Sequence, residues 1–141
     1  MRTEPTAAFR PEVCVGAIAL DDDRLLLVRR GHGPGAGSWS VPGGRVEAGE
    51  TLAAAVVREL AEETGLDAVC EALVGWVERI GDGYHYVIFD FKVTVLDPTG
   101  PVAGDDAAEV AWVPCDAVTH LNLVDGLAEF LHEHGILAVI A

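Results

Sequence analysis

The hydrophobic and polar positions of the chain follow the period of strands in several segments. The segments with the apolar content or alternation of strands are residues 13–20, 24–29, 69–77, 84–95 and 110–113. Three aspartates at 21–23 separate the first two segments and predict a hairpin turn, and a Gly-Asp-Gly turn at 81–83 joins the next two. The pattern therefore predicts a protein built largely around a sheet.

A helical period appears between two of these strands. Leu52, Val56 and Leu60 recur at steps of four residues, which places them on one buried stripe. Thr51 can cap the free amides at the start of this helix, and Gly65 can end it because glycine adopts a left-handed conformation at low cost. The sequence predicts an amphipathic helix that begins near residue 50 and ends at Gly65.

A second helix is predicted over residues 121–135, with apolar positions at Leu123, Leu127, Phe130 and Leu131. Residues 31–37 are too rich in glycine for a regular element and predict a mobile loop, and Pro42-Gly43-Gly44 predicts a tight turn. Residues 1–11 show no periodicity and predict a flexible arm. Strands and helices in uneven alternation within 141 residues predict one α/β domain, residues 12–141, with a mixed sheet packed between helices.

The charge of the chain excludes one class of partner. The formal net charge is −14 and Lys92 is the only lysine, so the surface repels a nucleic-acid backbone. An anionic substrate must instead be held by bound metal and a few local arginines. Residues 1–12 contain no apolar segment of a signal peptide, and no apolar run reaches the roughly 20 residues that span a bilayer. We expect a cytoplasmic protein that binds neither nucleic acid nor membrane.

Three glutamates gather on one face of the first predicted helix. At about 100° per residue, Glu62 lies roughly 60° to one side of Glu59 and Glu63 roughly 40° to the other. Two unneutralised carboxylates about 4 Å apart repel by about 4 kcal/mol at an effective dielectric constant of about 20. Such a face is either splayed into water or built to hold cations. Carboxylate oxygens suit Mg²⁺ or Mn²⁺, whereas zinc normally brings histidine or cysteine ligands.

The pattern around these glutamates resembles the Nudix box. The specified positions are Gly44, Glu50, Arg58, Glu59, Leu60, Glu62, Glu63, Gly65 and Leu66, and each is filled as the family signature requires. Trp39–Gly44 resembles the segment that precedes the box, Val15–Leu20 the first strand, and Glu109–Pro114 a later strand, so the resemblance covers most of residues 11–135. It implies an α/β/α sandwich and a hydrolase that cleaves the pyrophosphate bond of a nucleoside diphosphate linked to another group, with a divalent metal.

The resemblance also implies roles for individual residues. Glu59, Glu62 and Glu63 would bind the metal, together with the carbonyl of Gly43. Arg58 could pair with Glu62 one turn later or fold back onto Glu50, and in either case orient the ligands. The alternative for Arg58 is a surface ion pair worth at most about 1 kcal/mol.

The general base is not fixed by this pattern, because family members take it from the box or from a later loop. Glu62 and Glu63 are the candidates within the box. In the later loop, Glu109 is the first choice because it opens the last strand, and Asp106 is the second; Asp105 is a third acidic candidate in that loop.

The substrate is indicated by segments outside the box. Tyr84–Phe91 and Pro101–Glu109 resemble the subgroup of ADP-ribose pyrophosphatases, which implies ADP-ribose as substrate and AMP and ribose 5-phosphate as products. Candidates for a surface that stacks on adenine are Trp39, Tyr84, Tyr86 and Phe89, although aromatic residues in such positions are more often part of the core. Candidates for phosphate or ribose contacts are Arg29, Arg30, Arg45 and Arg79, because few basic residues exist.

Two other functions stay open at this stage. The same box serves enzymes of the MutT kind that release pyrophosphate from oxidised nucleoside triphosphates. A non-catalytic Nudix domain that senses a nucleotide would instead be expected to lack one of the glutamates. The apolar segment Ile136–Ala141 could seal a homodimer, form a last strand, or pack as a tail.

Overall fold

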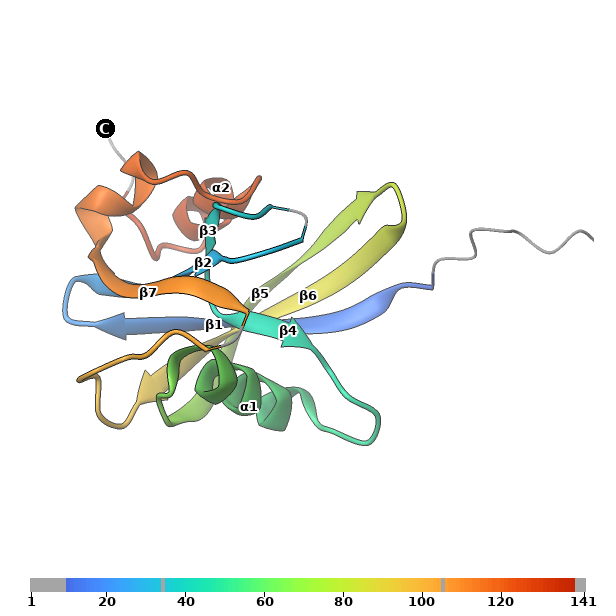
Figure 1. The fold of residues 1–141 in the computed structure, drawn as a ribbon, viewed down its shortest axis with the longest axis horizontal. Helices are drawn as coiled ribbons and strands as arrows, with labels where there is room; N and C mark the ends of the chain where they lie inside the picture. The colour runs from blue at the N-terminus through green and yellow to red at the C-terminus, as the bar shows by residue number, and fades with distance from the viewer. Residues whose placement is uncertain (1–9, 34, 105, 139–141) are drawn as a thin grey trace, which may run out of the picture.

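The protein folds as a seven-stranded sheet covered by one helix on each face (Figure 1). The structure is a computed structural model that describes residues 10–33, 35–104 and 106–138. The strands are β1 (Glu12–Asp21), β2 (Arg24–Arg30), β3 (Trp39–Ser40), β4 (Gly43–Arg45), β5 (Ala68–Gly81), β6 (Tyr84–Val95) and β7 (Ala107–Pro114). The helices are α1 (Leu52–Thr64), the 3₁₀ helix η1 (Cys115–His120) and α2 (Leu127–Glu133). This arrangement confirms the predicted mixed α/β/α architecture.

The sheet is mixed because β1 pairs in parallel with β6, whereas the other pairs of strands are antiparallel. The predicted hairpin of β1 and β2 is correct only next to its turn, where Leu20 pairs with Leu25 and Asp21 with Arg24. Beyond that point β4 takes the free edge of β1, while β2 turns away to pair with β3 and β7. The two halves of the sheet therefore diverge.

The core consists of two clusters, one on each face of the sheet. Val15 and Ala17 of β1 pack with Val56 and Leu60 of α1 in the first cluster. The neighbouring side chains of β1 point the other way because strand residues alternate, and Ile18 accordingly packs in the second cluster against α2. Burial on both faces explains why β1 has a nearly continuous apolar run.

The start and end of α1 agree with the prediction from sequence. The Thr51 hydroxyl accepts a hydrogen bond from the Ala54 amide at 3.1 Å, and Gly65 ends the helix with φ of 72°. These caps fix the helical residues that carry the acidic side chains, so they determine where those carboxylates lie relative to the sheet.

The second helix is shorter than predicted. Residues 121–126 are not helical, because the Trp39 amide donates to the Asn122 carbonyl and the Val124 amide donates to the Trp39 carbonyl. Gly126, with φ of 83°, then precedes α2. Bridging to β3 thus overrides the helical period over this segment. The expected turn before the box is likewise corrected, since Gly43–Arg45 forms the short strand β4 against β1.

The ends of the chain are described in part. Residues 1–9 of the predicted arm and residues 139–141 lie outside the described residues. Before them, Leu137 is buried and Ile136 packs against the α2 cluster, so this part of the C-terminal segment packs against the domain. Within the described residues no helix is long and apolar enough to cross a membrane.

Candidate active site

A cleft of about 520 Å³ opens where the two halves of the sheet diverge. Its walls come from β1, β2, β4, β6, α1 and the loops before β3 and β7. The lining residues include Cys14, Gly16, Val28, Arg29, Arg30, His32, Ser40, Val41, Gly43, Gly44, Arg45, Glu59, Glu63, Tyr86, Ile88, Asp90 and Asp106. The cleft therefore joins the acidic face of α1 to the sheet.

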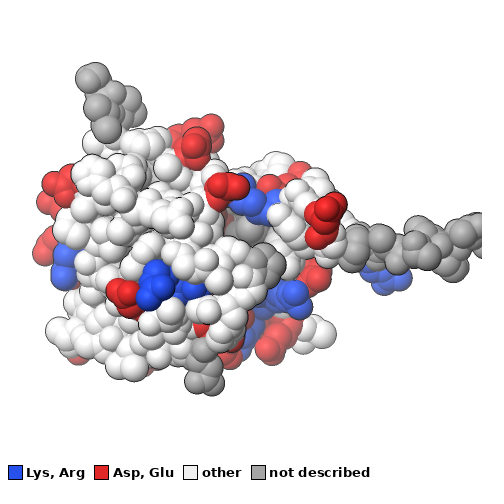
Figure 2. Space-filling view, turned by 45° about the horizontal axis from the view of Figure 1, so that its top comes forward, with Lys and Arg blue, Asp and Glu red and all other residues white. Residues whose placement is uncertain are grey.

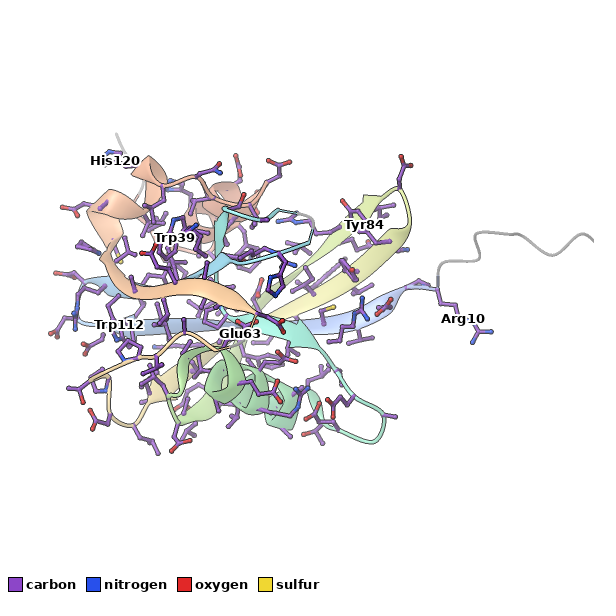
Figure 3. The ribbon with its side chains drawn as sticks, viewed as in Figure 1. Arg10, Trp39, Glu63, Tyr84, Trp112 and His120 are labelled. Carbon is purple, nitrogen blue, oxygen red and sulfur yellow. The ribbon has the colours of Figure 1, made fainter. Side chains whose placement is uncertain are left out.

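Two of the three glutamates predicted as metal ligands, Glu59 and Glu63, line this cleft, as does Gly43. Figure 3 places Glu63 at the centre of the molecule, between α1 and the sheet. Its Oε2 accepts a hydrogen bond from the Gly43 amide at 3.1 Å. Burial raises the pKa of Glu63 to about 7, and burial also raises the pKa of Glu59. Both carboxyls thus lie where negative charge is costly unless a cation neutralises it.

Glycine 44 makes room for the Glu59 carboxyl. A Cβ atom at this position would overlap the carboxyl carbon and both carboxyl oxygens of Glu59. The glycine of the box therefore allows a close approach between β4 and α1. The sequence suggested only a tight turn here.

We expect Gly44→Ala to lower turnover at least about 10-fold, because the new methyl group displaces the Glu59 carboxyl from the cleft wall. Steady-state kinetics with circular dichroism would measure the effect. A matched control is Gly100→Ala, because a Cβ atom there meets no atom within 4 Å and Gly100 does not line the cleft, although its φ of 67° makes that substitution mildly strained. Full activity in Gly44→Ala would contradict the described packing.

Arg58 binds three box carboxylates at once. Its Nε and Nη2 donate to the two oxygens of Glu50 at 2.6 and 2.9 Å, and its Nη1 donates to Glu59 at 2.9 Å and to Glu62 at 3.1 Å. Nη2 also donates to the Arg45 carbonyl at 3.0 Å. Both pairings expected from the sequence are present, and Arg58 lowers the pKa of Glu50 to about 2. Arg58 therefore positions the glutamates of the box.

The three predicted ligands do not converge. Glu62 is 58% exposed at its side chain and turns outward to Arg58. Among the described residues, no group of three or more carboxylate, histidine or cysteine side chains is placed to hold a metal ion. Glu59 and Glu63 nevertheless fit Mg²⁺ or Mn²⁺, because they supply hard oxygen donors, are half-buried, and are not fully neutralised. Mg²⁺ commonly takes one or two protein carboxylates and completes its shell with water and substrate phosphate.

The candidates for the general base occupy different places. Asp106 lines the same cleft as Glu63, and its negative charge adds to the rise in the pKa of Glu63 that burial causes. The His32 Nε2 atom lies 3.5 Å from Asp106 Oδ1. Glu109, the first choice from sequence, instead accepts hydrogen bonds from Arg29 at 3.0 and 3.2 Å and is absent from the lining. Asp105 lies outside the described residues.

Of the four arginines predicted to contact the substrate, three line the cleft and one does not. Arg29, Arg30 and Arg45 line the cleft, and Arg30 lowers the pKa of Glu63 by charge attraction. Arg79 does not line it and lies beside Gly126 at the start of α2. The charged groups that Figure 2 shows on this face are mostly separate clusters of both signs among uncharged residues. Three of the nine basic residues of this acidic protein therefore line the cleft.

The two tyrosines stack on each other with ring centroids 5.3 Å apart. Tyr86 lines the cleft and carries the Arg45 guanidinium 6.0 Å from its ring centroid, whereas Tyr84 lies towards the tip of the β5–β6 hairpin (Figure 3). Trp39 packs against the α2 cluster. Only Tyr86 among these three aromatic candidates faces the cleft.

Sequence reasoning did not assign a role to Asp90, which is buried in the cleft floor. Burial raises its pKa to about 7, with Arg79 acting in the opposite direction. Because side chains alternate along a strand, Asp90 lies on the same face of β6 as Tyr86, and both line the cleft. Gly16 on β1 and Gly75 on β5 lie beside Asp90 because of the strand register, which the sequence alone did not indicate.

Comparisons with known proteins agree with this geometry. A protein of Methanocaldococcus jannaschii called ADP-ribose pyrophosphatase is 42% identical over 107 residues, which are 74% of this chain and 62% of that protein. A Mycobacterium tuberculosis protein called putative 8-oxo-dGTP diphosphatase 2 is 57% identical over 107 residues, covering 65% of this chain and 73% of that protein. The chain thus spans less than two thirds of the archaeal relative's length.

A solved NUDIX hydrolase from Nitrosomonas europaea superposes with a TM-score of 0.79 at 26% identity over 90% of each chain. The sequence model of the NUDIX domain matches residues 10–134, which include the box, the cleft and both helices. The chain belongs to the Nudix family.

Proposed function

We propose that this protein hydrolyses the pyrophosphate bond of a nucleoside diphosphate linked to another group, and that ADP-ribose is its substrate. The observation that carries the proposal is the pair of half-buried carboxyls, Glu59 and Glu63, that lie against Gly44 and Gly43 at the wall of a cleft that also contains arginines. The products would be AMP and ribose 5-phosphate. The similarity to the archaeal protein called ADP-ribose pyrophosphatase supports this choice.

The metal would be Mg²⁺ or Mn²⁺, held by Glu59 and Glu63 with Glu62 and the Gly43 carbonyl as further predicted ligands. When bound, it would neutralise phosphate oxygens and lower the pKa of the attacking water. Arg29 and Arg30 line the same cleft and can bind phosphate oxygens of the substrate. The net charge of −14 makes these local cations necessary for holding an anion.

Asp106, in the loop before β7, lines the cleft. We propose that it accepts the proton of the attacking water, in preference to Glu109, whose oxygen is occupied by Arg29. The nearby His32 can receive that proton or stabilise the carboxylate form of Asp106. Arg58 would hold Glu59 and Glu62 in position without touching the substrate.

A second candidate is the release of pyrophosphate from oxidised nucleoside triphosphates. The 57% identity to the mycobacterial protein called putative 8-oxo-dGTP diphosphatase 2 supports it. The two candidates share the carboxylates and the metal and differ in the product. A homodimer, which the sequence left open as one possibility, and the expected cytoplasmic location remain predictions.

A panel of substrates with identified products distinguishes these candidates. It should contain ADP-ribose, other nucleoside diphosphate sugars, dinucleotides, and normal and oxidised nucleoside triphosphates, each with Mg²⁺. We expect the highest kcat/KM for ADP-ribose with release of AMP. Preferred cleavage of a triphosphate with release of pyrophosphate would contradict the substrate, and no turnover of any compound would support a nucleotide-sensing domain.

A further inference from the structure

Four large apolar side chains of the β5–β6 hairpin and the adjoining part of β1 are exposed. Trp76 is 58% exposed, Ile80 69%, Leu73 49% and Val13 42%. Large contiguous apolar patches are rare on the surface of soluble monomers, and they mark the places where such proteins meet a partner. Strand register shows that these side chains lie together.

The register of β5 and β6 places two of them on the sheet face that α1 covers. Leu73 lies directly opposite Phe91, and Trp76 lies directly opposite Phe89. Side chains at directly opposite positions share a face, and residues two apart on a strand share a face as well. Because Phe91 packs in the core cluster of α1, Leu73 and Trp76 point to the α1 side of the sheet.

Val13 and Ile80 extend the same surface. Val13 pairs with Val87, which alternates with Phe89 on one face of β6, and Ile80 follows Trp76 along β5 at an even spacing. The hairpin extends past α1, so the helix does not cover this part of the sheet (Figure 1). We call this surface the hairpin face; it consists of Val13, Leu73, Trp76, Ile80, Val87 and Phe89.

The hairpin face lies on the other side of the sheet from the cleft. Tyr86, Ile88 and Asp90 alternate with Val87 and Phe89 along β6, and all three line the cleft. A partner that binds the hairpin face therefore leaves the cleft open to substrate.

Charge indicates the kind of partner. Two copies of a chain with a formal net charge of −14 repel each other, so they can associate only through a surface that carries little charge. Glu78 is the carboxylate beside Trp76 and Ile80, and its Oε2 atom lies 2.8 Å from His85 Nε2, so it is paired within the chain. Arg79 pairs with Tyr86 and points to the cleft side, so this part of β5 offers no cation to anionic lipids.

The geometry of β5 favours contact through side chains over the addition of a strand. β5 is the edge of its half of the sheet, and bulges interrupt it between Cys70 and Leu73 and between Leu73 and Gly75. Bulges hinder the pairing of an edge with another strand. Faces of two sheets, in contrast, pack about 10 Å apart with their side chains interdigitated, and a two-fold axis makes one apolar face complementary to its own copy.

The area of the hairpin face is sufficient for a weak dimer. A tryptophan side chain contributes about 200 Å² and an aliphatic one about 100 Å², so the four most exposed side chains present roughly 300 Å² of apolar surface. The partly exposed Val87 and Phe89 and a polar rim enlarge it. Two such faces together approach the roughly 1,000 Å² at which specific interfaces begin.

We propose that two copies of this chain associate through the hairpin face, with Trp76 as the central anchor between Leu73 and Ile80. The inference goes beyond the proposed function, because it concerns a surface opposite the cleft and no substrate. It also differs from the C-terminal interface that the sequence left open, since Ile136 and Leu137 pack within the domain.

Sedimentation equilibrium over roughly a hundredfold range of protein concentration tests the proposal, because mass action makes a weak dimer depend on concentration. The wild type would be compared with Trp76→Glu and Ile80→Glu, each of which adds a charge to the hairpin face. Val102→Glu is the matched control, because Val102 is 69% exposed like Ile80 but lies in the loop between β6 and β7. Thermal unfolding shows whether each variant is folded.

We expect a dimer with a micromolar dissociation constant for the wild type and for Val102→Glu. Each substitution on the hairpin face should raise that constant about 10-fold or more, because buried aromatic anchors dominate interfaces and a buried unpaired charge opposes them. Acrylamide should quench the fluorescence of Trp76 less as the wild type dimerises, and Trp76→Phe identifies its share of the emission. ADP-ribose hydrolysis per chain should stay within about twofold in both variants, since the cleft lies on the other face.

A wild type that stays monomeric over the whole range would overturn the proposal, as would a dimer that persists unchanged in Trp76→Glu and Ile80→Glu. Equal weakening by Val102→Glu would also overturn it, because the effect would then come from added charge alone. Failure of the proposed function is a separate result, namely that the wild type does not hydrolyse ADP-ribose whether it is monomeric or dimeric.

Discussion

Glu63→Gln is expected to hydrolyse ADP-ribose at least about 100-fold more slowly than the wild type while keeping its fold. The amide has the same shape but no charge, so the cleft loses half of the carboxylate pair that would hold the metal. Because the substituted side chain can still accept the hydrogen bond from the Gly43 amide, the packing of β4 against α1 is preserved. Initial rates at saturating Mg²⁺ measure the effect.

Two further variants complete this comparison. Glu62→Gln should also lower turnover by orders of magnitude if Glu62 is a ligand, as the resemblance to the Nudix box implies, even though its side chain turns outward here. Glu129→Gln on the exposed surface of α2 is the matched control and should leave the rate unchanged. Near-normal activity in both box variants would contradict the assignment of metal ligands.

Glu63→Gln should also change how the free energy of unfolding depends on pH. Burial raises the pKa of Glu63 to about 7 in the folded protein, above its usual value near 4.5. A raised pKa means that the contribution of Glu63 to stability is fully present below about pH 4.5 and is lost as pH rises through about 7. This loss is at most about 3 kcal/mol for a shift of that size.

Urea unfolding in EDTA at pH 5 and pH 8 measures this effect. From pH 5 to pH 8 the wild type should lose stability as Glu63 ionises, whereas the uncharged amide of Glu63→Gln is unaffected. The free energy of unfolding of Glu63→Gln should therefore rise relative to that of the wild type. Mg²⁺ should stabilise the wild type at pH 8 more than the variant, since only the carboxylate binds it. A difference that does not change with pH would contradict the burial of this carboxyl.

Arg58→Ala is expected to lower turnover about 100-fold and to reduce the free energy of unfolding by about 2 kcal/mol. The substitution leaves Glu50, Glu59 and Glu62 without the guanidinium that neutralises them. Removing one partner of a partly buried ion pair destabilises a protein by more than the intact pair stabilises it, because the other charge is left uncompensated. Arg58→Lys should recover only part of the activity, because an ammonium group cannot reproduce the planar fork that binds both oxygens of Glu50.

The matched control for Arg58 is Arg24→Ala. Arg24 makes a surface ion pair with Asp21, and such pairs contribute at most about 1 kcal/mol. Kinetics and chemical denaturation of the three variants separate a positioning role from a general loss of charge. Activity of Arg58→Ala within threefold of the wild type would show that the box carboxylates hold their positions without it.

The elements that local residue patterns determine could be predicted from the sequence. Thr51 and Gly65 fix the ends of α1 through their own hydrogen bonds and backbone angle, so the chain around them suffices. The long strands β5 and β6 follow from their apolar content, although the sequence did not indicate that β5 extends to Gly81. The box residues also identified the family, because their spacing is specific.

Features that depend on distant pairing could not be predicted in this way. Residues 121–126 have a helical period, yet they bridge to Trp39, more than 80 positions earlier. The separation of β1 from β2 depends on β4 taking the edge of β1, and this separation creates the cleft. The position of Asp90 between two glycines depends on the register of three strands.

The proposed activity is tested most directly by ADP-ribose hydrolysis by metal-stripped protein as Mg²⁺ is added back, with the products identified. We expect no turnover in EDTA, a saturable increase in rate with Mg²⁺, and equal amounts of AMP and ribose 5-phosphate. Turnover that persists without a divalent metal, or none at saturating Mg²⁺, would contradict the claim that this cleft is the active site of a metal-dependent ADP-ribose hydrolase.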